Sequence, residues 1–222
     1  MILRKKGQVM MAKKRKKRNL VTYLYPDSYI ADQFRTIRTN IRFITTGSNK
    51  RTFLVASPDA GEGKSITIAN LAVSMAQQKE KILLIDANLR SPVLHTIFKL
   101  PNDKGITSIL KHKVPINEAI CHTEIGKLDV LTSGSVFFNP GEIIGSDLMK
   151  ELLQNAANEY DIVLIDSPSV LEYTETRVLA NYCDGVLLLL KHAKTELEKA
   201  SEAIRVLDLA HSQIVGAIIN DK

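Results

Sequence analysis

The chain has 222 residues, 45% of them hydrophobic, and a formal net charge of +6 at neutral pH. This length predicts one large globular domain with a substantial core, and a count of two cysteines, Cys121 and Cys183, excludes a disulfide framework. The apolar runs, such as residues 186–190, are too short to cross a bilayer, so cytoplasmic residence is the default expectation.

The positive charge belongs to the N-terminus. Residues 1–18 contain nine lysines and arginines and no acidic residue, so residues 19–222 carry a net charge of −3. Such runs are usually solvated, and they bind anionic membranes or nucleic acids. We therefore predict a flexible basic tail at residues 1–18 and one globular domain at residues 19–222.

Helices and strands alternate along the domain. Residues 27–46 are typical of an amphipathic helix, because apolar residues recur at helical spacing from Ile30 to Ile44. An apolar strand at residues 53–56 leads into a helix over residues 65–78. Five more strands are expected, at residues 81–86, 128–132, 161–166, 185–190 and 213–219, separated by helices at residues 117–121, 141–158, 176–182 and 195–211. This order predicts an α/β fold with a three-layer, doubly wound, mostly parallel sheet.

A phosphate-binding loop is predicted at residues 57–65, between the first strand and its helix. Glycines let the main chain approach phosphates closely, and the N–H groups at the helix N-terminus face the anion. Lys64 would reach the β- and γ-phosphates, and the Ser65 hydroxyl would help to hold Mg²⁺. The strict pattern has a glycine where this chain has Pro58. The residues assigned to nucleotide binding are Gly61, Glu62, Gly63, Lys64, Ser65 and Ile66.

Two of the later strands end in an acidic residue, Asp86 and Asp166. Ligands of a parallel α/β sheet bind at the carboxyl ends of its strands, where both carboxylates are expected beside the phosphate loop. Carboxylate oxygens are the ligands that Mg²⁺ prefers, directly or through water. The sequence therefore predicts ATP and Mg²⁺ as cofactors, with Lys64, Asp86 and Asp166 as catalytic residues and Ser65, Asp86 and Asp166 at the metal.

Three motifs resemble those of the bacterial protein-tyrosine kinases of capsule and exopolysaccharide gene clusters. They are Gly61-Glu62-Gly63-Lys64-Ser65, Leu84-Ile85-Asp86-Ala87-Asn88-Leu89-Arg90, and Leu164-Ile165-Asp166-Ser167-Pro168. Residues 34–40 resemble the helix through which members of this family pack into rings. The resemblance implies a P-loop NTPase of the deviant Walker class, with a kinase domain at residues 19–222 that begins with an oligomerisation helix.

The same resemblance implies a function and partners. The expected activity is ATP-dependent phosphorylation of tyrosine in proteins, during capsular or exopolysaccharide synthesis or export. The expected partners are a transmembrane activator, further copies of the chain in a ring and tyrosine-containing substrates, with no specific nucleic acid. The basic tail is then expected at the inner face of the membrane. Asp32, Arg35 and Arg38 would lie at the ring interface, and Asn220 resembles an asparagine that closes on the nucleotide base, although a loop residue is the simpler interpretation.

Several residues depart from the family pattern. Asn88 stands where the family has a second aspartate, and a neutral amide cannot act as a carboxylate base. The last tyrosine is Tyr182, whereas family members usually end in a tyrosine cluster. These departures motivate an alternative function, that of a catalytically weakened, ATP-gated regulatory component of the same machinery. A third interpretation, a partition or Min-type ATPase, is disfavoured because Asp59 occupies the place of the second lysine of those proteins.

Overall fold

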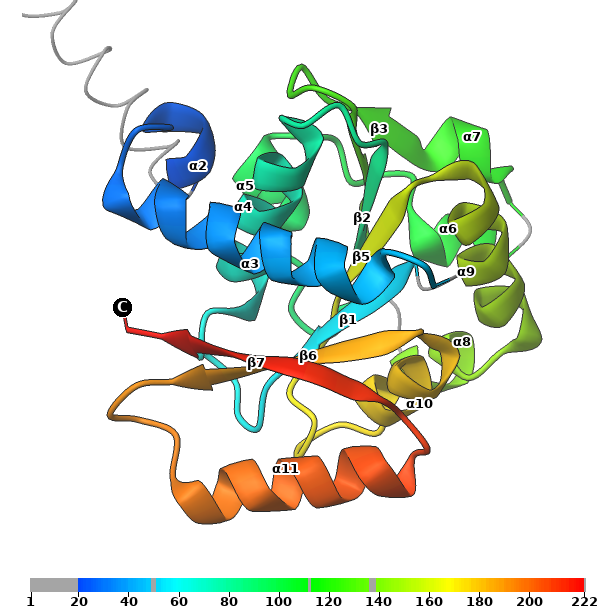
Figure 1. The fold of residues 1–222 in the computed structure, drawn as a ribbon. Helices are drawn as coiled ribbons and strands as arrows, with labels where there is room; N and C mark the ends of the chain where they lie inside the picture. Colours follow the sequence, from blue (N-terminus) through cyan, green and yellow to red (C-terminus); the bar gives the residue numbers. More distant parts are fainter. Residues whose placement is uncertain (1–19, 49–50, 112, 136–138, 222) are drawn as a thin grey trace, which may run out of the picture.

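The computed structural model describes residues 20–48, 51–111, 113–135 and 139–221 (Figure 1). The predicted basic tail at residues 1–18 lies outside the described residues, so its flexibility and its boundary with the domain stay predictions. No helix in the described part of the chain combines the length and the apolar character that crossing a bilayer would require.

A seven-stranded sheet forms the centre of the described fold, in the order β3-β4-β2-β5-β1-β6-β7. Every neighbouring pair of strands is parallel except β3 and β4, which are antiparallel. The predicted mostly parallel sheet is therefore confirmed. The strands are β1 (Thr52–Ala56), β2 (Ile82–Asp86), β3 (Ile120–His122), β4 (Leu128–Leu131), β5 (Ile162–Asp166), β6 (Gly185–Lys191) and β7 (Ile214–Asn220).

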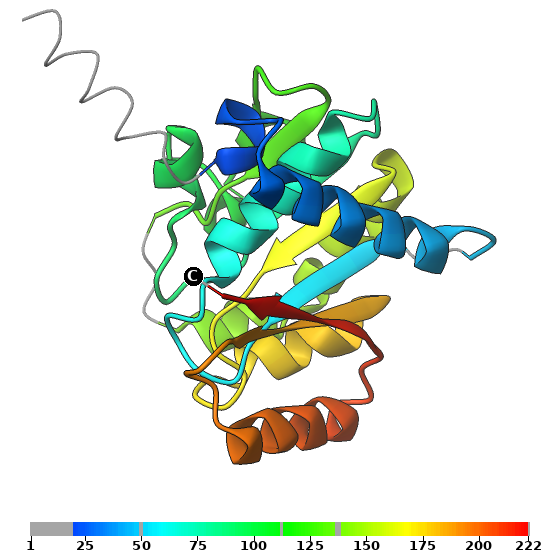
Figure 2. The ribbon, with the colours of Figure 1, turned by 60° about the vertical axis from the view of Figure 1, so that its left-hand side comes forward.

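Helices cover both faces of this sheet, which makes the three predicted layers (Figures 1 and 2). One face packs against α3 and α4, and the other against α9, α10 and α11. The helices are α2 (Val21–Leu24), α3 (Tyr29–Thr45), α4 (Lys64–Ala76), α5 (Leu94–Phe98), α6 (Ile106–Ile109), α7 (Ile116–Ala119), α8 (Pro140–Ile144), α9 (Asp147–Glu159), α10 (Glu175–Tyr182) and α11 (Leu197–Leu209).

The central strands are almost entirely apolar because both of their faces are buried. On β1, Leu54 contributes to the core beneath α9 to α11, whereas Phe53 and Val55 contribute to the core beneath α3 and α4. All five residues of β1 are buried, as are all five of β2 and of β5. Continuous apolar runs are typical of strands that carry helices on both sides, so the sequence pattern and the layering have one cause.

The start of the domain is fixed to α4 by polar contacts. Arg38 on α3 donates to the Ser74 carbonyl oxygen over 2.6 Å. In α2, the Thr22 amide and hydroxyl both donate to Oδ1 of Asn70, over 3.0 Å each. These bonds place the first predicted helix across α4, the helix that carries the phosphate loop at its N-terminus.

Two predicted helices were partly wrong. The helix expected at residues 117–121 ends at Ala119, because Ile120, Cys121 and His122 pair with β4 as an edge strand. The helix expected at residues 141–158 is interrupted at Gly145 and Ser146, where the Ser146 hydroxyl accepts from the Met149 amide and caps α9. The short helices α2, α5 and α6 were missed, since four or five residues are too few to show a helical period.

Candidate active site

The phosphate loop connects the end of β1 to the first residue of α4, as predicted. Gly61 and Gly63 have φ angles of +74° and +100°, in the left-handed region that side chains rarely adopt. A Cβ atom on Gly63 would lie 2.5 Å from Nδ2 of Asn220. The left-handed backbone angle therefore favours glycine at position 63, and a side chain there would also displace the Asn220 amide.

We expect Gly63→Ala to weaken nucleotide binding roughly tenfold, because left-handed strain of about 1–2 kcal/mol reshapes the loop that surrounds the phosphates. Calorimetric titration with Mg·ATP measures the effect. Gly141→Ala is the matched control, since nothing lies within 4 Å of a Cβ atom built there. Equal affinities for the two variants would contradict this role of Gly63.

Lys64 lies with its side chain folded over the loop. It is 6% exposed, and its Nζ atom donates to Oγ of Ser57 over 2.6 Å and to the carbonyl oxygen of Asp59 over 3.4 Å. Burial lowers the pKa of Lys64, and the nearby charge of Asp166 opposes that shift. Both hydrogen bonds use uncharged oxygen atoms, so the ammonium charge remains available to a bound phosphate.

Asp86 and Asp166 are register partners at the carboxyl ends of β2 and β5, and both are fully buried. Oδ2 of Asp86 accepts from the amides of Val93 and Leu94, over 3.1 and 3.0 Å. Burial raises the pKa of Asp86 to about 8, and the charge of Asp166 adds to the shift. Burial also raises the pKa of Asp166 to about 6, against the lowering effects of the Ser65 hydroxyl and the Lys64 ammonium.

These two carboxylates fit a magnesium site. Oδ1 of Asp86 and both carboxylate oxygens of Asp166 are buried and have no well-formed hydrogen bond among the described residues. Buried carboxylates are normally paired or bound to a metal, and Mg²⁺ takes one or two carboxylates together with phosphate oxygens and water. Ser65, Asp86 and Asp166 are therefore the residues that would hold the ion.

A cavity of about 350 Å³ lies at the phosphate loop. Three segments line it: the phosphate loop with the start of α4, the segment after β2 and the segment after β5. Lys64 and Ser65 come from the first, Asn88 and Arg90 from the second, and Glu172 from the third. The three predicted motifs thus meet around one space, which has room for the phosphates of a nucleotide and an approaching hydroxyl.

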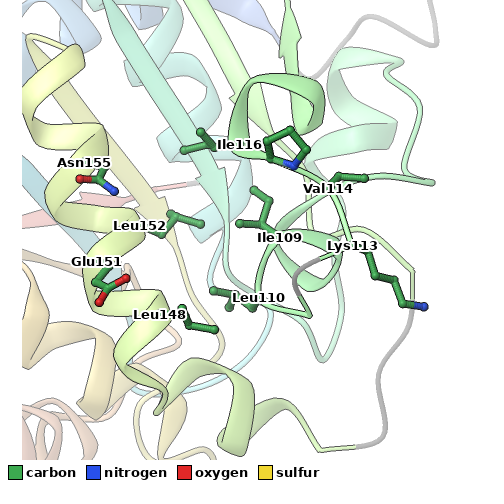
Figure 3. Close-up of a pocket in the computed structure, with 10 residues that line it drawn as sticks. Ile109, Leu110, Lys113, Val114, Ile116, Leu148, Glu151, Leu152 and Asn155 are labelled. Carbon is green, nitrogen blue, oxygen red and sulfur yellow. The ribbon is translucent and has the colours of Figure 1, made fainter.

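A second cavity, of about 420 Å³, lies between α9 and the segment that includes α6 and α7 (Figure 3). Ile109, Leu110, Leu148 and Leu152 line it, with Glu151 at its edge. No residue of the three motifs contributes to it. Its lining is mainly aliphatic, so we expect phosphates to bind in the smaller cavity, at the phosphate loop.

Comparison with known proteins identifies the family. Residues 50–218 match the family model described as AAA domain. Tyrosine-protein kinase YwqD of Bacillus subtilis is 43% identical over 208 residues, which cover 94% of this chain and 88% of the relative. The putative tyrosine-protein kinase CapB of Staphylococcus aureus is 33% identical, with 92% of each chain covered. The crystal structure of the chimerical protein CapA2B2 has a TM-score of 0.86 at 32% identity, covering 91% of this chain and 89% of that one. This chain belongs to the bacterial tyrosine-protein kinase family.

The sequence did not predict the contacts that Arg90 makes across this kinase domain. Arg90, in the second motif, donates through Nη2 to Oε1 of the buried Glu175 over 2.7 Å. The Arg90 guanidinium also lies over the Tyr173 ring, 4.8 Å from its centroid. This ion pair ties the segment after β2 to the segment after β5.

The predicted nucleotide residues of the kinase domain lie together. Asn220 is the last residue of β7, not a loop residue, and its Nδ2 atom donates to the Glu62 carbonyl oxygen over 2.8 Å. The end of β7 accordingly reaches the phosphate loop (Figure 2). The buried Glu62 side chain instead points away from the cavity, where its Oε1 atom accepts from the Thr195 hydroxyl.

The three predicted interface residues lie on α3 and have partners within the chain. Asp32 and Arg35 form an ion pair one turn apart, and Arg38 is bonded to α4 through Ser74. Asp59, the residue that disfavours a partition-type ATPase, pairs with Lys199 of α11 over 2.7 Å. Where those ATPases have a second lysine, this kinase domain has an acid held by a lysine from another helix.

Proposed function

We propose that this protein is an ATP-dependent kinase that transfers the γ-phosphate to tyrosine in proteins, in the synthesis or export of a capsular or extracellular polysaccharide. One observation carries the proposal. Lys64 lines the cavity at which the three motifs meet and interacts with the charge of Asp166, the register partner of Asp86, in a chain that is 43% identical to a named tyrosine-protein kinase.

Each group has a part in the proposed reaction. The amides of residues 61–66 bind the phosphates, and Lys64 moves its ammonium from the Ser57 hydroxyl to the β- and γ-phosphates. Ser65, Asp86 and Asp166 would hold Mg²⁺, which when bound neutralises phosphate charge. Because the metaphosphate-like transition state requires little covalent chemistry from the protein, catalysis consists mainly of positioning and charge stabilisation.

The partners in this proposal are a membrane protein and further copies of the chain. A transmembrane activator would bring the kinase to the inner face of the membrane, where residues 1–18 add nine positive charges at about 1 kcal/mol for each one near anionic lipid. A ring of copies would use the α3 face that carries Asp32 and Arg35, which are both surface residues.

The experiment is a phosphotyrosine assay of the purified complex with the cytoplasmic tail of its activator. With γ-labelled ATP and Mg²⁺, label is expected on tyrosine, more strongly with the activator tail than without it. Tight ATP binding without any transfer to tyrosine, with the activator tail present, would overturn the proposal.

A second candidate is a regulatory component with weakened catalysis, and Asn88 is the observation that favours it. Asn88 lines the cavity, and its Oδ1 atom accepts from the Ser91 amide over 3.2 Å. If the missing carboxylate limits the reaction, Asn88→Asp should raise the transfer rate by about 10²-fold or more. A rate within a few-fold of the wild type would show that position 88 is not limiting.

A further inference from the structure

We propose that Glu172 is the general base of this kinase and takes the place of the carboxylate that Asn88 cannot supply. The assignment rests on the proposed tyrosine kinase function and names the group that receives the proton of the substrate hydroxyl. Glu172 lies outside the three sequence motifs, six residues after Asp166.

Glu172 lines the same cavity as Lys64, Ser65 and Asn88, and it is exposed to solvent. Among the described residues that line this cavity, it is the one with a carboxylate. A tyrosine hydroxyl that enters to meet the γ-phosphate therefore comes within reach of this group.

The carboxylate is also oriented. The Ser169 hydroxyl donates to Oε2 of Glu172 over 2.7 Å, and Ser169 itself is buried. Within the described part of the chain, Oε1 has no hydrogen-bond donor, so it is free to accept a proton from a substrate. A base held through one oxygen and open at the other has the geometry that general base catalysis needs.

The charge of Glu172 acts on a residue of the phosphate loop. Its charge contributes to raising the pKa of Lys64, together with the charges of Asp166, Glu62 and Asp59. It acts in the same direction on Lys199 of α11. The Glu172 charge thus acts on both cations, and within the described part of the chain Glu172 forms no ion pair that would block its oxygens.

The other nearby carboxylates have different partners. Asp86 and Asp166 are fully buried and are the residues that would hold the metal, and Glu175 is paired with Arg90. Glu62 accepts from Thr195 on the far side of the loop. Of the acidic residues around the site that the structure describes, Glu172 is the one that is both accessible and unpaired with a cation.

The proposed step combines a proton transfer with a phosphoryl transfer. The tyrosine O–H bond breaks, and its proton passes to Oε1 of Glu172. The phenolic oxygen forms a bond to the γ-phosphorus of ATP while the bond from that phosphorus to the β,γ-bridging oxygen breaks. ADP leaves with the bond electrons, and Glu172 later releases the proton to water.

Four proteins test the assignment: the wild type, Asn88→Asp, Glu172→Gln and the double variant. Each is assayed with the activator tail, ATP, Mg²⁺ and a glutamate–tyrosine copolymer as acceptor. We expect Glu172→Gln to lower kcat by about 10²- to 10⁴-fold with the affinity for ATP unchanged. Asn88→Asp alone should change kcat only a few-fold, and in the double variant it should restore most of the lost rate.

Rescue separates a base from a structural residue, because a carboxylate at position 88 does not repair a segment that has lost its fold. Glu198→Gln, an exposed position on α11, is the matched control and should have the wild-type kcat. A Glu172→Gln variant as fast as the wild type, or one that Asn88→Asp fails to rescue, would overturn the assignment while leaving the kinase function standing. A wild type that binds ATP and transfers no phosphate would overturn both.

Discussion

Lys64→Met is expected to abolish phosphoryl transfer while leaving the folded protein at least as stable as the wild type. The ammonium is nearly buried, and its hydrogen bonds are to neutral oxygens. Burial therefore costs free energy, as the lowered pKa of Lys64 indicates. Methionine has a similar length and no charge, so the free energy of unfolding should stay constant or rise.

The catalytic loss has a separate cause. Lys64 is the loop cation expected to neutralise charge that develops on the phosphates, and removing one preorganised group of this kind typically costs about 10²- to 10³-fold in kcat. Denaturant unfolding and the phosphotyrosine assay are measured on the same preparation. Lys150→Met, an exposed change on α9, is the control for both. A Lys64→Met protein that is much less stable than the wild type would contradict the view that burying the Lys64 charge costs stability and serves catalysis.

The layered fold could be predicted from the sequence because strands buried on both faces have an unmistakable composition. Residues 82–85 and 162–165 are each continuously apolar and are each followed by an aspartate, and they form adjacent parallel strands with those aspartates in register. The edge strand β3 could not be predicted in the same way. Ile120 and Cys121 are half-buried and His122 is exposed, and only their pairing with β4 makes these residues a strand.

The candidate site could be predicted wherever a single short segment contains the functional residues. The phosphate loop and the two aspartates are of this kind. Contacts between distant segments were not visible, as Arg90 with Glu175 and Asn220 with Glu62 illustrate. The local sequence around Glu172 does not mark it as a cavity residue. It lines the cavity because of the path of the chain after β5, which puts Ser169 beside it.

The metal-free protein is expected to lose stability as the pH rises from about 4 to about 8. Asp86 has its folded-state pKa raised to about 8, from an ordinary value of 3.8. Between these values the folded state binds more protons than the unfolded state, so the free energy of unfolding falls with rising pH. The contribution is fully present below the unfolded-state pKa and is lost by the time the pH passes the folded-state pKa.

Asp86→Asn should remove the part of this dependence that Asp86 contributes and leave the smaller part due to Asp166, whose pKa is raised to about 6. The amide oxygen can accept from the amides of Val93 and Leu94, and its NH₂ group is a donor beside Asp166 where the wild type has an unpartnered oxygen. In EDTA at pH 8 the variant should be more stable than the wild type by on the order of a few kcal/mol, with little difference at pH 4.

The same variant should lose Mg²⁺-dependent transfer, because an amide is a poorer ligand for a hard cation. Urea unfolding in EDTA across this pH range measures the stability, and exposed Asp208→Asn is the matched control, with a pH profile expected to follow the wild type. Parallel profiles for wild type and Asp86→Asn would show that Asp86 is solvated in the metal-free state. Folding does not require an acid without a cationic partner at this position. A variant that gains stability and loses activity would therefore show that Asp86 is buried to bind a metal ion.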